Sequence, residues 1–283
     1  ASPALYGEAS DRRTICISSQ VGCAYGCKFC ASGLDGWKRN LTAAEIVDQF
    51  LQVEAESGEK INNIVFMGMG EPMANYDNLL RAISILNAPW GVGIGARHMP
   101  ISTSRPAPRI RDLAAQPLQV RLAISFHGAT DEVRGRIMPV NKKYPIEELL
   151  DACVRYALRK PRTSITFEYT MMQGVNDLPE HARALAKLMR RIDAKVQRAN
   201  TAKVNLIPFN PFDGTRFERS EESRIRDFQK LLLDSGVLTM VRRTRGDDID
   251  AACGQLKGQV MDKTRRQAEF KRKSYIDSIT RIN

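Results

Sequence analysis

The sequence predicts an α/β protein of parallel strands, arranged as a partial barrel of the (β/α)6 type. Two observations support this prediction. Short apolar, β-branched runs alternate with longer stretches of helical periodicity, a pattern typical of right-handed strand–helix–strand units. Six or seven such units occupy about 240 residues, which suits a barrel better than a small doubly wound sheet.

The expected elements follow one another with short connections. Strands are expected at residues 14–19, 61–68, 98–104, 120–126, 164–172, 202–210 and 238–245, and helices at residues 42–57, 75–87, 107–116, 145–160, 178–192 and 220–236. The first helix has a clear beginning. Thr42 is a suitable N-cap, and Glu45 stands three residues later, where a capping box places an acidic side chain.

Composition restricts the class of protein. With 283 residues, of which 43% are hydrophobic and 27% charged, the chain suits a soluble globular protein with a substantial core. No stretch is long and apolar enough to span a membrane, and the N-terminus lacks the features of a signal peptide. We therefore expect no membrane association and a reducing cytoplasm. We expect an N-terminal extension at residues 1–13, one barrel domain at 14–258 and a basic tail at 259–283.

The formal net charge is +11, from 43 Lys and Arg against 32 Asp and Glu. Such an excess favours a polyanionic partner such as RNA, because each neutralised phosphate releases counterions. A merely basic soluble protein has the same charge, so both interpretations stay open. Much of the excess is local: residues 262–283 contain seven Lys or Arg against three Asp or Glu.

Every stretch of unusual composition follows the end of an expected strand. These stretches are CAYGCKFC at 23–30, GMGEP at 68–72, STSR at 102–105, SFHG at 125–128, MMQGVND at 171–177, PFNP at 208–211 and TRGDDIDAACGQ at 244–255. In a barrel of parallel strands the carboxyl ends converge on one face, where the active site lies. The sequence therefore predicts an active site at this face.

The cysteine-rich stretch indicates the kind of site. Cys23, Cys27 and Cys30 are too close together to form disulfides comfortably. A zinc site needs a fourth ligand, which His127 could bring from another strand end. Iron–sulfur clusters are built on thiolates, and three thiolates on a 4Fe-4S cluster leave one iron for an exchangeable ligand. We expect these three cysteines to hold a 4Fe-4S cluster; structural cysteines are the alternative.

The spacing Cys-x3-Cys-x2-Cys, with an aromatic residue before the last cysteine, resembles that of the radical S-adenosylmethionine (SAM) superfamily. This resemblance implies that the free iron binds SAM and that the reduced cluster cleaves SAM to methionine and a 5′-deoxyadenosyl radical. Seven stretches in order resemble the RlmN/Cfr family of radical-SAM RNA adenine methyltransferases: CISSQVGCAYGCKFCASG, RNLTAAEIVDQ, FMGMGEP, MPVNKKYPIEELL, ITFEYTMMQGVND, KVNLIPFNP and VRRTRGDDIDAACGQL. The match covers roughly residues 14–258.

The resemblance also implies which residues contact SAM. They are Gly70, Glu71, Ser102, Ser125, His127 and Asn210. For two of these residues a structural role is the alternative: Glu71 is suited to cap the following helix, and His127 to end a strand.

Methylation of an adenine carbon poses a chemical problem that two more cysteines address. Carbon 2 of adenine is electrophilic, so it cannot simply attack the methyl group of a sulfonium ion, whereas a radical that carries the methyl carbon can add to it. By the resemblance, Cys253 carries the methyl group and Cys16 resolves the adduct through a transient disulfide with Cys253. Neighbouring first and last strands of a closed barrel would bring the two thiols together. Two ordinary core cysteines are the alternative, and we expect that role for Cys153.

Other polar residues near the expected site suit structural or binding roles. Glu168, within an apolar strand, is expected to be structural and to pair with an Arg inside the barrel. The charged loop at 242–248 suits either an ion-pair network or contacts to RNA. Trp37 and Arg39 are candidates to hold an adenine that has left its stack, because aromatic and guanidinium faces stack on bases.

The resemblance implies methylation of carbon 2 of an adenine in 23S rRNA, and also in tRNA, by a monomer that receives electrons from flavodoxin or ferredoxin. One alternative is the same chemistry at carbon 8, as in Cfr, or on a different substrate. A non-catalytic iron–sulfur protein that binds RNA or senses redox state is another. The loop with Cys253 resembles the RlmN version more than the Cfr version.

The chain departs from the family pattern in three places. Family members have an accessory domain before the barrel, and we expect this chain to lack it. Pro3 stands where the family has its general-base Glu, so the base is unassigned. STSR and SFHG replace the usual Ser-Thr-Ser-Gly and Ser-Leu-His-Ala, and Arg105 in place of Gly is expected to reshape the SAM pocket.

Overall fold

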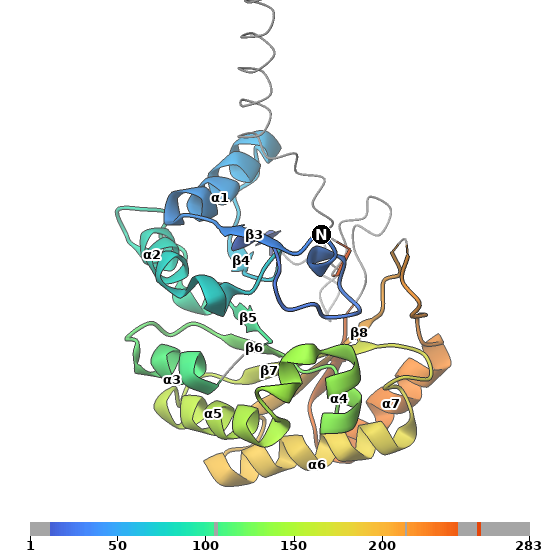
Figure 1. Ribbon diagram of the computed structural model, residues 1–283. Helices are drawn as coiled ribbons and strands as arrows, with labels where there is room; N and C mark the ends of the chain where they lie inside the picture. Colours follow the sequence, from blue (N-terminus) through green and yellow to red (C-terminus); the bar gives the residue numbers. More distant parts are fainter. Residues whose placement is uncertain (1–11, 105–106, 213, 243–253, 256–283) are drawn as a thin grey trace, which may run out of the picture.

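The computed structural model of this protein describes residues 12–104, 107–212, 214–242 and 254–255. Within them, seven parallel strands follow one another in sequence order (Figure 1). They are β1 (Thr14–Cys16), β4 (Asn63–Val65), β5 (Ile101–Thr103), β6 (Leu122–Ser125), β7 (Ile165–Met171), β8 (Ala202–Pro208) and β9 (Thr239–Val241). A parallel bridge between Phe66 and Ile101 joins the β1–β4 pair to the five-stranded sheet. The expected α/β partial barrel is confirmed.

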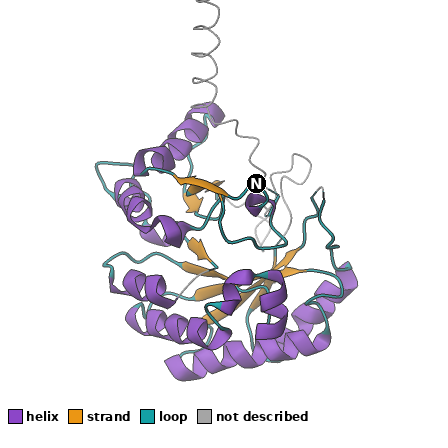
Figure 2. Ribbon diagram, viewed as in Figure 1, coloured by secondary structure: helices purple, strands orange, loops and turns teal. Residues whose placement is uncertain are grey.

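Helices cover the outer side of this curved sheet (Figure 2). They are α1 (Ala43–Ser57), α2 (Tyr76–Asn87), α3 (Ala107–Ala115), α5 (Ile146–Arg159), α6 (Pro179–Val196) and α7 (Glu222–Asp234). Each buries an apolar stripe in the common core, as Phe50 of α1 and Tyr156 of α5 show, both fully buried. None of the described helices is both long enough and apolar enough to cross a membrane.

The start of α1 follows the capping-box prediction. The Thr42 side chain accepts a hydrogen bond from the Glu45 backbone N–H, and the Glu45 carboxylate accepts one from the Thr42 N–H at 2.9 Å. Arg39 adds two hydrogen bonds to the same carboxylate, at 2.9 and 2.7 Å. The three residues together tie the segment before α1 to the helix.

Two elements at the strand ends were not predicted. One is α4 (Asp131–Ile137), and the other is an antiparallel hairpin of β2 (Gln20–Gly22) and β3 (Trp37–Asn40). Several expected strands are also shorter than predicted. The strand expected at 98–104, for example, begins as a 3-10 turn at Ala96–His98 and is extended only at β5.

The barrel is open in the described part of the chain. There β1 pairs only with β4, and β9 pairs only with β8. The expectation that closure makes the first and last strands neighbours is therefore wrong, since seven strands of this curvature do not complete the circle. The residues from 243 onward in the last expected strand, almost all of the 1–13 extension and the whole 259–283 tail lie outside the described residues.

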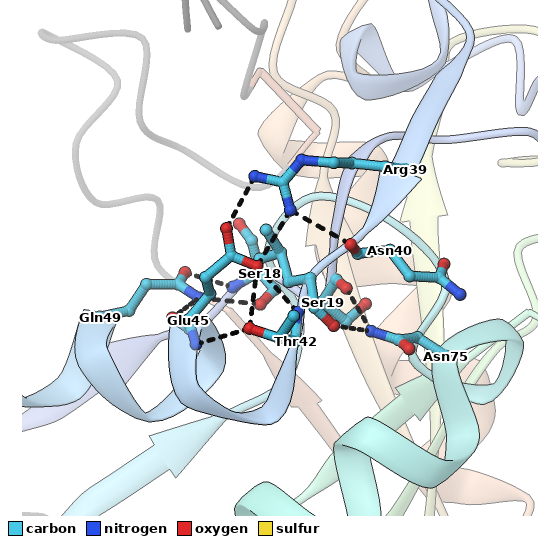
Figure 3. A network of polar contacts seen from close by, with 9 residues as sticks. Ser18, Ser19, Arg39, Asn40, Thr42, Glu45, Gln49 and Asn75 are labelled. Carbon is cyan, nitrogen blue, oxygen red and sulfur yellow. Dashed lines mark hydrogen bonds and ion pairs between the residues drawn. The ribbon is translucent and has the colours of Figure 1, made fainter. Parts of the chain in front are cut away.

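A polar network fixes the segment that leads from β1 into the cysteine loop (Figure 3). The Gln49 amide of α1 binds the main chain of Ser18 twice, accepting from its N–H at 2.9 Å and donating to its carbonyl at 3.0 Å. Asn75 donates to the carbonyls of Ser19 and Leu41, at 2.8 and 2.6 Å. Two helices thus hold this irregular segment through its backbone.

Replacing Gln49 tests this anchoring. Gln49→Ala leaves the part-buried N–H and carbonyl of Ser18 without their partners, so we expect the free energy of unfolding to fall by about 1–3 kcal/mol. Gln52→Ala is the matched control, because Gln52 lies on the same helix, is exposed and bonds only Asp48; its effect should stay within about 0.5 kcal/mol. Urea unfolding measures both, and equal losses would show that the Gln49 bonds are not stabilising.

Candidate active site

A cavity opens at the carboxyl ends of the strands. Its wall includes the three clustered cysteines, Cys23, Cys27 and Cys30, and five of the six residues expected to contact SAM, namely Gly70, Glu71, Ser102, Ser125 and His127. Glu168, Arg242 and Gly254 also line it. The loops that follow different strands therefore meet here, as the positions of the unusual stretches in the sequence predict.

Backbone hydrogen bonds hold the cysteine loop at both ends and in the middle. Cys23 donates its N–H to the Gly36 carbonyl at 3.2 Å, Lys28 to Ile137 at 2.9 Å and Ala31 to Gly254 at 2.8 Å. These partners lie in the β2–β3 connection, at the end of α4 and beside Cys253. The loop is thus fixed by three separate parts of the chain.

Glycine is required where this loop meets β3. Gly22 has a φ of 72°, and a Cβ at this position would lie 1.9 Å from the Gly36 carbonyl oxygen. Both the backbone conformation and the space exclude a side chain. The hairpin can therefore close tightly against the first cysteine.

The donor set of the loop suits an iron–sulfur cluster. Burial, more than any other cause, raises the pKa of Cys23 to about 11 and raises that of Cys27 further, and the neighbouring cysteines add to both shifts. The thiolates are therefore unfavourable unless cationic iron neutralises them. Three thiolates are the kind of donor set that a cluster uses, and each would bind one iron.

The GMGEP turn is fastened to the end of β5 through Glu71. Its buried carboxylate accepts hydrogen bonds from Thr103 Oγ1 at 2.8 Å, from the Ser104 N–H and Oγ at 2.9 and 2.8 Å, and from the Met73 N–H at 3.0 Å. Burial raises the pKa of Glu71, and these four bonds oppose that shift. The bond to Met73 caps the short helix Pro72–Asn75, as the structural alternative for Glu71 requires. Glu71 also lines the cavity, so the same residue has both positions.

Gly70, next to Glu71, has a φ of 98°, and a Cβ there would lie 2.5 Å from Gln20 Cβ. The Glu71 N–H donates to Gln20 Oε1 at 2.8 Å. The turn thus packs directly on the segment before the cysteine loop, which brings the two family motifs into contact.

Ser102 and Ser125 present two hydroxyls from adjacent strands. Their Oγ atoms are 3.4 Å apart across β5 and β6, and both side chains reach the cavity. Asn210, the sixth expected residue, is buried just after β8 but is not part of the described wall, whereas its neighbour Phe209 is.

His127 is held as a neutral imidazole. Its Nδ1 accepts a hydrogen bond from the Thr170 N–H at 2.9 Å, which leaves the proton on Nε2. Burial, aided by the charge of Arg134, lowers the pKa of His127 to about 3. The residue has a φ of 55°, and its ring centroid lies 4.6 Å from that of Phe29. The ring therefore offers a fixed N–H donor beside the cysteine loop.

Several residues of the wall were not among those expected to bind ligands, Glu168 and Arg242 among them. Glu168 is buried in β7 and accepts a hydrogen bond from Asn205 at 2.7 Å. Burial raises the pKa of Glu168, while the nearby Arg242 lowers it. The expectation of an Arg near Glu168 agrees with this arrangement, but the side chain faces the cavity. The sequence feature that could have indicated a residue of the cavity here is a carboxylate within an apolar strand.

Of the two cysteines assigned to methyl transfer, the structure describes only Cys16. Cys253, like Pro3 and residues 243–248, lies outside the described residues. The carbonyl of the adjacent Gly254 accepts the Ala31 N–H of the cysteine loop, and Gly254 lines the cavity. Cys16 is exposed at the end of β1 and is not on the described wall, so it is not a core cysteine. Cys153 is fully buried on α5, as expected.

The neutral state of His127 predicts a pH dependence of stability. Between pH 6.5 and 3 the unfolded chain binds a proton at this histidine that the folded chain does not. The stability of the folded state that depends on a neutral His127 is therefore complete above pH 6.5 and is lost as the pH falls. We expect the free energy of unfolding of the cofactor-free protein, relative to His127→Asn, to fall by about 1.4 kcal/mol per unit below pH 6.5. Urea unfolding at pH 7, 6 and 5 measures it; a pH-independent difference would contradict it.

Comparison with known proteins agrees with this geometry. The radical SAM superfamily profile matches residues 17–189. The dual-specificity RNA methyltransferase RlmN of Xanthomonas campestris pv. campestris (strain B100) is 54% identical over 275 residues, covering 95% of this chain and 68% of that protein. RlmN of Stenotrophomonas maltophilia (strain K279a) is 55% identical over 273 residues, covering 94% and 68%. The crystal structure of a radical SAM methyltransferase from Sphaerobacter thermophilus has a TM-score of 0.81 at 44% identity, covering 88% of this chain and 71% of that one. The chain therefore belongs to the RlmN family of radical SAM RNA methyltransferases, whose cofactors are a 4Fe-4S cluster and SAM.

Proposed function

We propose that this enzyme methylates carbon 2 of an adenine in 23S rRNA and in tRNA, with Cys253 as the methyl carrier and Cys16 as the resolving thiol. The observation that carries the proposal is the contact between Gly254 and the cysteine loop. It brings the residue next to Cys253 to the wall that also bears Cys23, Cys27 and Cys30. A methyl carrier must lie near the place where the radical forms, and this contact supports such a position.

In this proposal Cys23, Cys27 and Cys30 bind three irons of the cluster, and the fourth iron is left for SAM. Bound together, the two cofactors supply a carbon radical that abstracts hydrogen atoms. The electron comes from a donor such as flavodoxin or ferredoxin, and the enzyme acts as a monomer in the cytoplasm, where its RNA substrates are.

The polar residues of the wall orient SAM. Gly70 and Glu71 present the GMGEP turn to its amino group, and the hydroxyls of Ser102 and Ser125 stand opposite this turn. His127 donates from Nε2 in a neutral form, so its contribution does not change across physiological pH. Asn210 completes the set from the loop after β8.

The two thiols carry out the transfer and the release. Cys253 Sγ holds a methyl group, which loses one hydrogen atom and adds as a methylene to carbon 2 of adenine. The adenine adduct would then pass one electron to the cluster, which SAM cleavage leaves oxidised, and its carbon-2 proton to a base, after which the Cys16 thiolate attacks Cys253 Sγ. The bond between sulfur and methylene breaks, the disulfide forms, and the carbon takes up a proton to become the product methyl group. Cys16 lies at the end of β1, the strand that leads into the cysteine loop.

The decisive experiment uses reconstituted protein with SAM, a reductant and ribosomal RNA or tRNA that lacks the modification. Mass spectrometry of the digested RNA should show 2-methyladenine. Cys253→Ala should abolish methylation and protein-bound methyl while SAM cleavage continues. Cys16→Ala should accumulate a covalent adduct between protein and RNA.

Cys153→Ala is the matched control, because Cys153 is buried on α5 away from the cavity, and it should retain methylation. Methyl groups at carbon 8 of adenine would show that the enzyme carries out the Cfr-like reaction instead. SAM cleavage without any modified adenine would contradict the assignment of an RNA adenine substrate. If the Cys253→Ala variant still methylates RNA, Cys253 is not the methyl carrier.

Of the two residues considered for holding the adenine, we favour Trp37. Arg39 is engaged by Glu45 through two hydrogen bonds. Trp37 is 49% exposed on β3, and its backbone pairs with that of Gly22, next to the first cluster cysteine. An exposed indole beside the site provides a face on which a base can stack.

We expect Trp37→Ala to weaken RNA binding by about 1–3 kcal/mol, the range for one base stacked on an aromatic residue, without affecting SAM cleavage. Trp90→Ala is the control, since Trp90 is 81% exposed in the loop after α2 and is the only other tryptophan. Fluorescence anisotropy with a labelled RNA hairpin measures both affinities. A similar loss in both variants would indicate general surface effects instead of a base contact at Trp37.

A further inference from the structure

Arg134 of α4 is one of the most deeply buried side chains of the protein, with 1% of its surface exposed. Its Nε donates to the Phe126 carbonyl at 3.0 Å, and one terminal nitrogen donates to the carbonyls of Ser104 and Ser125, at 3.2 and 3.3 Å. The other terminal nitrogen donates to Asn141 Oδ1 at 2.7 Å. The guanidinium thus joins the ends of β5 and β6 to α4.

All of these partners are neutral. Among the described residues, no carboxylate oxygen lies within 4.0 Å of the Arg134 guanidinium. Burial lowers the pKa of Arg134 only to about 10, so the group remains a cation at neutral pH. A buried charge without a counter-charge is strongly unfavourable. The fold therefore maintains a positive charge that the described side chains do not balance.

The position of this charge is beside the cysteine loop. Arg134 lies directly behind the cavity wall, because the carbonyls that it binds belong to Ser104 and Ser125, which line the cavity. One turn further along α4, the Ile137 carbonyl accepts the N–H of Lys28, the residue after Cys27. The Cys27 thiol is also the acidic group whose charge interacts most strongly with Arg134.

We propose that Arg134 is a positioning residue whose fixed positive charge stabilises the cluster site, and above all its reduced state. Three thiolates make the cluster site anionic, and reduction adds one more negative charge. A cation fixed behind the wall that bears Cys27 stabilises the reduced form more than the oxidised form, and net charge is one of the factors that set cluster potentials. The inference rests on the proposed assignment of Cys27 as a cluster ligand.

A merely structural role is the alternative, in which Arg134 only holds the strand ends through its hydrogen bonds. The two roles can be distinguished, because stabilisation of the reduced cluster depends on the charge of Arg134, whereas holding the strand ends depends on the geometry of its hydrogen bonds. Gln at position 134 keeps a donor and removes the charge. Lys keeps the charge and cannot reproduce the planar, forked set of bonds.

The experiment measures the ratio of reduced to oxidised cluster at a fixed ambient potential, by electron paramagnetic resonance on reconstituted protein. We expect Arg134→Gln to lower this ratio about tenfold, equivalent to about 59 mV for one electron. Arg134→Lys should keep the wild-type ratio within about twofold. Thermal unfolding of the cofactor-free proteins should show that both variants lose stability, since both lose hydrogen bonds.

Lys160→Met is the matched control for the loss of a buried cation. Lys160 is 3% exposed, at the end of α5, and donates to the Gln116 carbonyl. It is not part of the cavity wall and has no described contact with the cysteine loop, so its removal should leave the ratio unchanged. An unchanged ratio in Arg134→Gln, or an equal fall in both Arg134 variants, would overturn the inference.

A second variant covers the case in which Arg134→Gln does not fold. Asp131, on the first turn of α4, is exposed and is the nearest acidic influence on Arg134 after Cys27. Asp131→Asn retains its shape and should raise the ratio of reduced to oxidised cluster; no change or a fall would count against the inference. If the wild type binds no cluster at all, the assignment of the ligands fails instead, which iron and sulfide analysis shows independently.

Discussion

Because β5, β6, β7 and β8 pair in parallel and in sequence order, the loops that follow them open on one rim of the sheet. The pairing continues past β6, where the N–H groups of Phe126 and His127 both donate to the Glu168 carbonyl, at 3.0 and 3.2 Å. The chain then turns sharply, with His127 in the left-handed region. Asn176, in the loop after β7, fixes that turn by donating to the carbonyls of His127 and Thr170. The position of the histidine therefore follows from the register of the sheet.

Close approach between loops is the second requirement of this rim. Gly22 and Gly70 stand where two segments touch through their backbones, and a side chain at either position would overlap its neighbour. Together with the Gln49 and Asn75 amides, these contacts fix the cysteine loop relative to the GMGEP turn. The loop is thus placed by the protein itself, through contacts that involve none of its thiols.

The alternation of strands and helices, the capping box at Thr42 and the cysteine motif were predictable because each depends on residues close together in the sequence. Other features depend on distant contacts. Strand β7 is buried on both faces, so alternation gives no indication of which way Glu168 points. Helix α4 has only seven residues and includes a glycine; Arg134 and Asn141 stabilise it through tertiary bonds that no local pattern reveals. Whether a sheet closes depends on strand number and shear, which is why adjacency of the first and last strands was wrongly inferred.

Three of the buried ionic groups of the rim are stabilised in different ways. Glu71 receives four hydrogen bonds, and Glu168 has the Asn205 amide and the nearby charge of Arg242. Arg134 has only neutral acceptors. Ser104 connects two of these groups, since its N–H and hydroxyl donate to Glu71 while its carbonyl accepts from Arg134. This arrangement orients the Ser104 peptide between a carboxylate and a cation, so each charge strengthens the bond at the other end. The carboxylates are thereby satisfied within the protein, and the positive charge that remains faces the one part of the rim where anionic thiolates are expected.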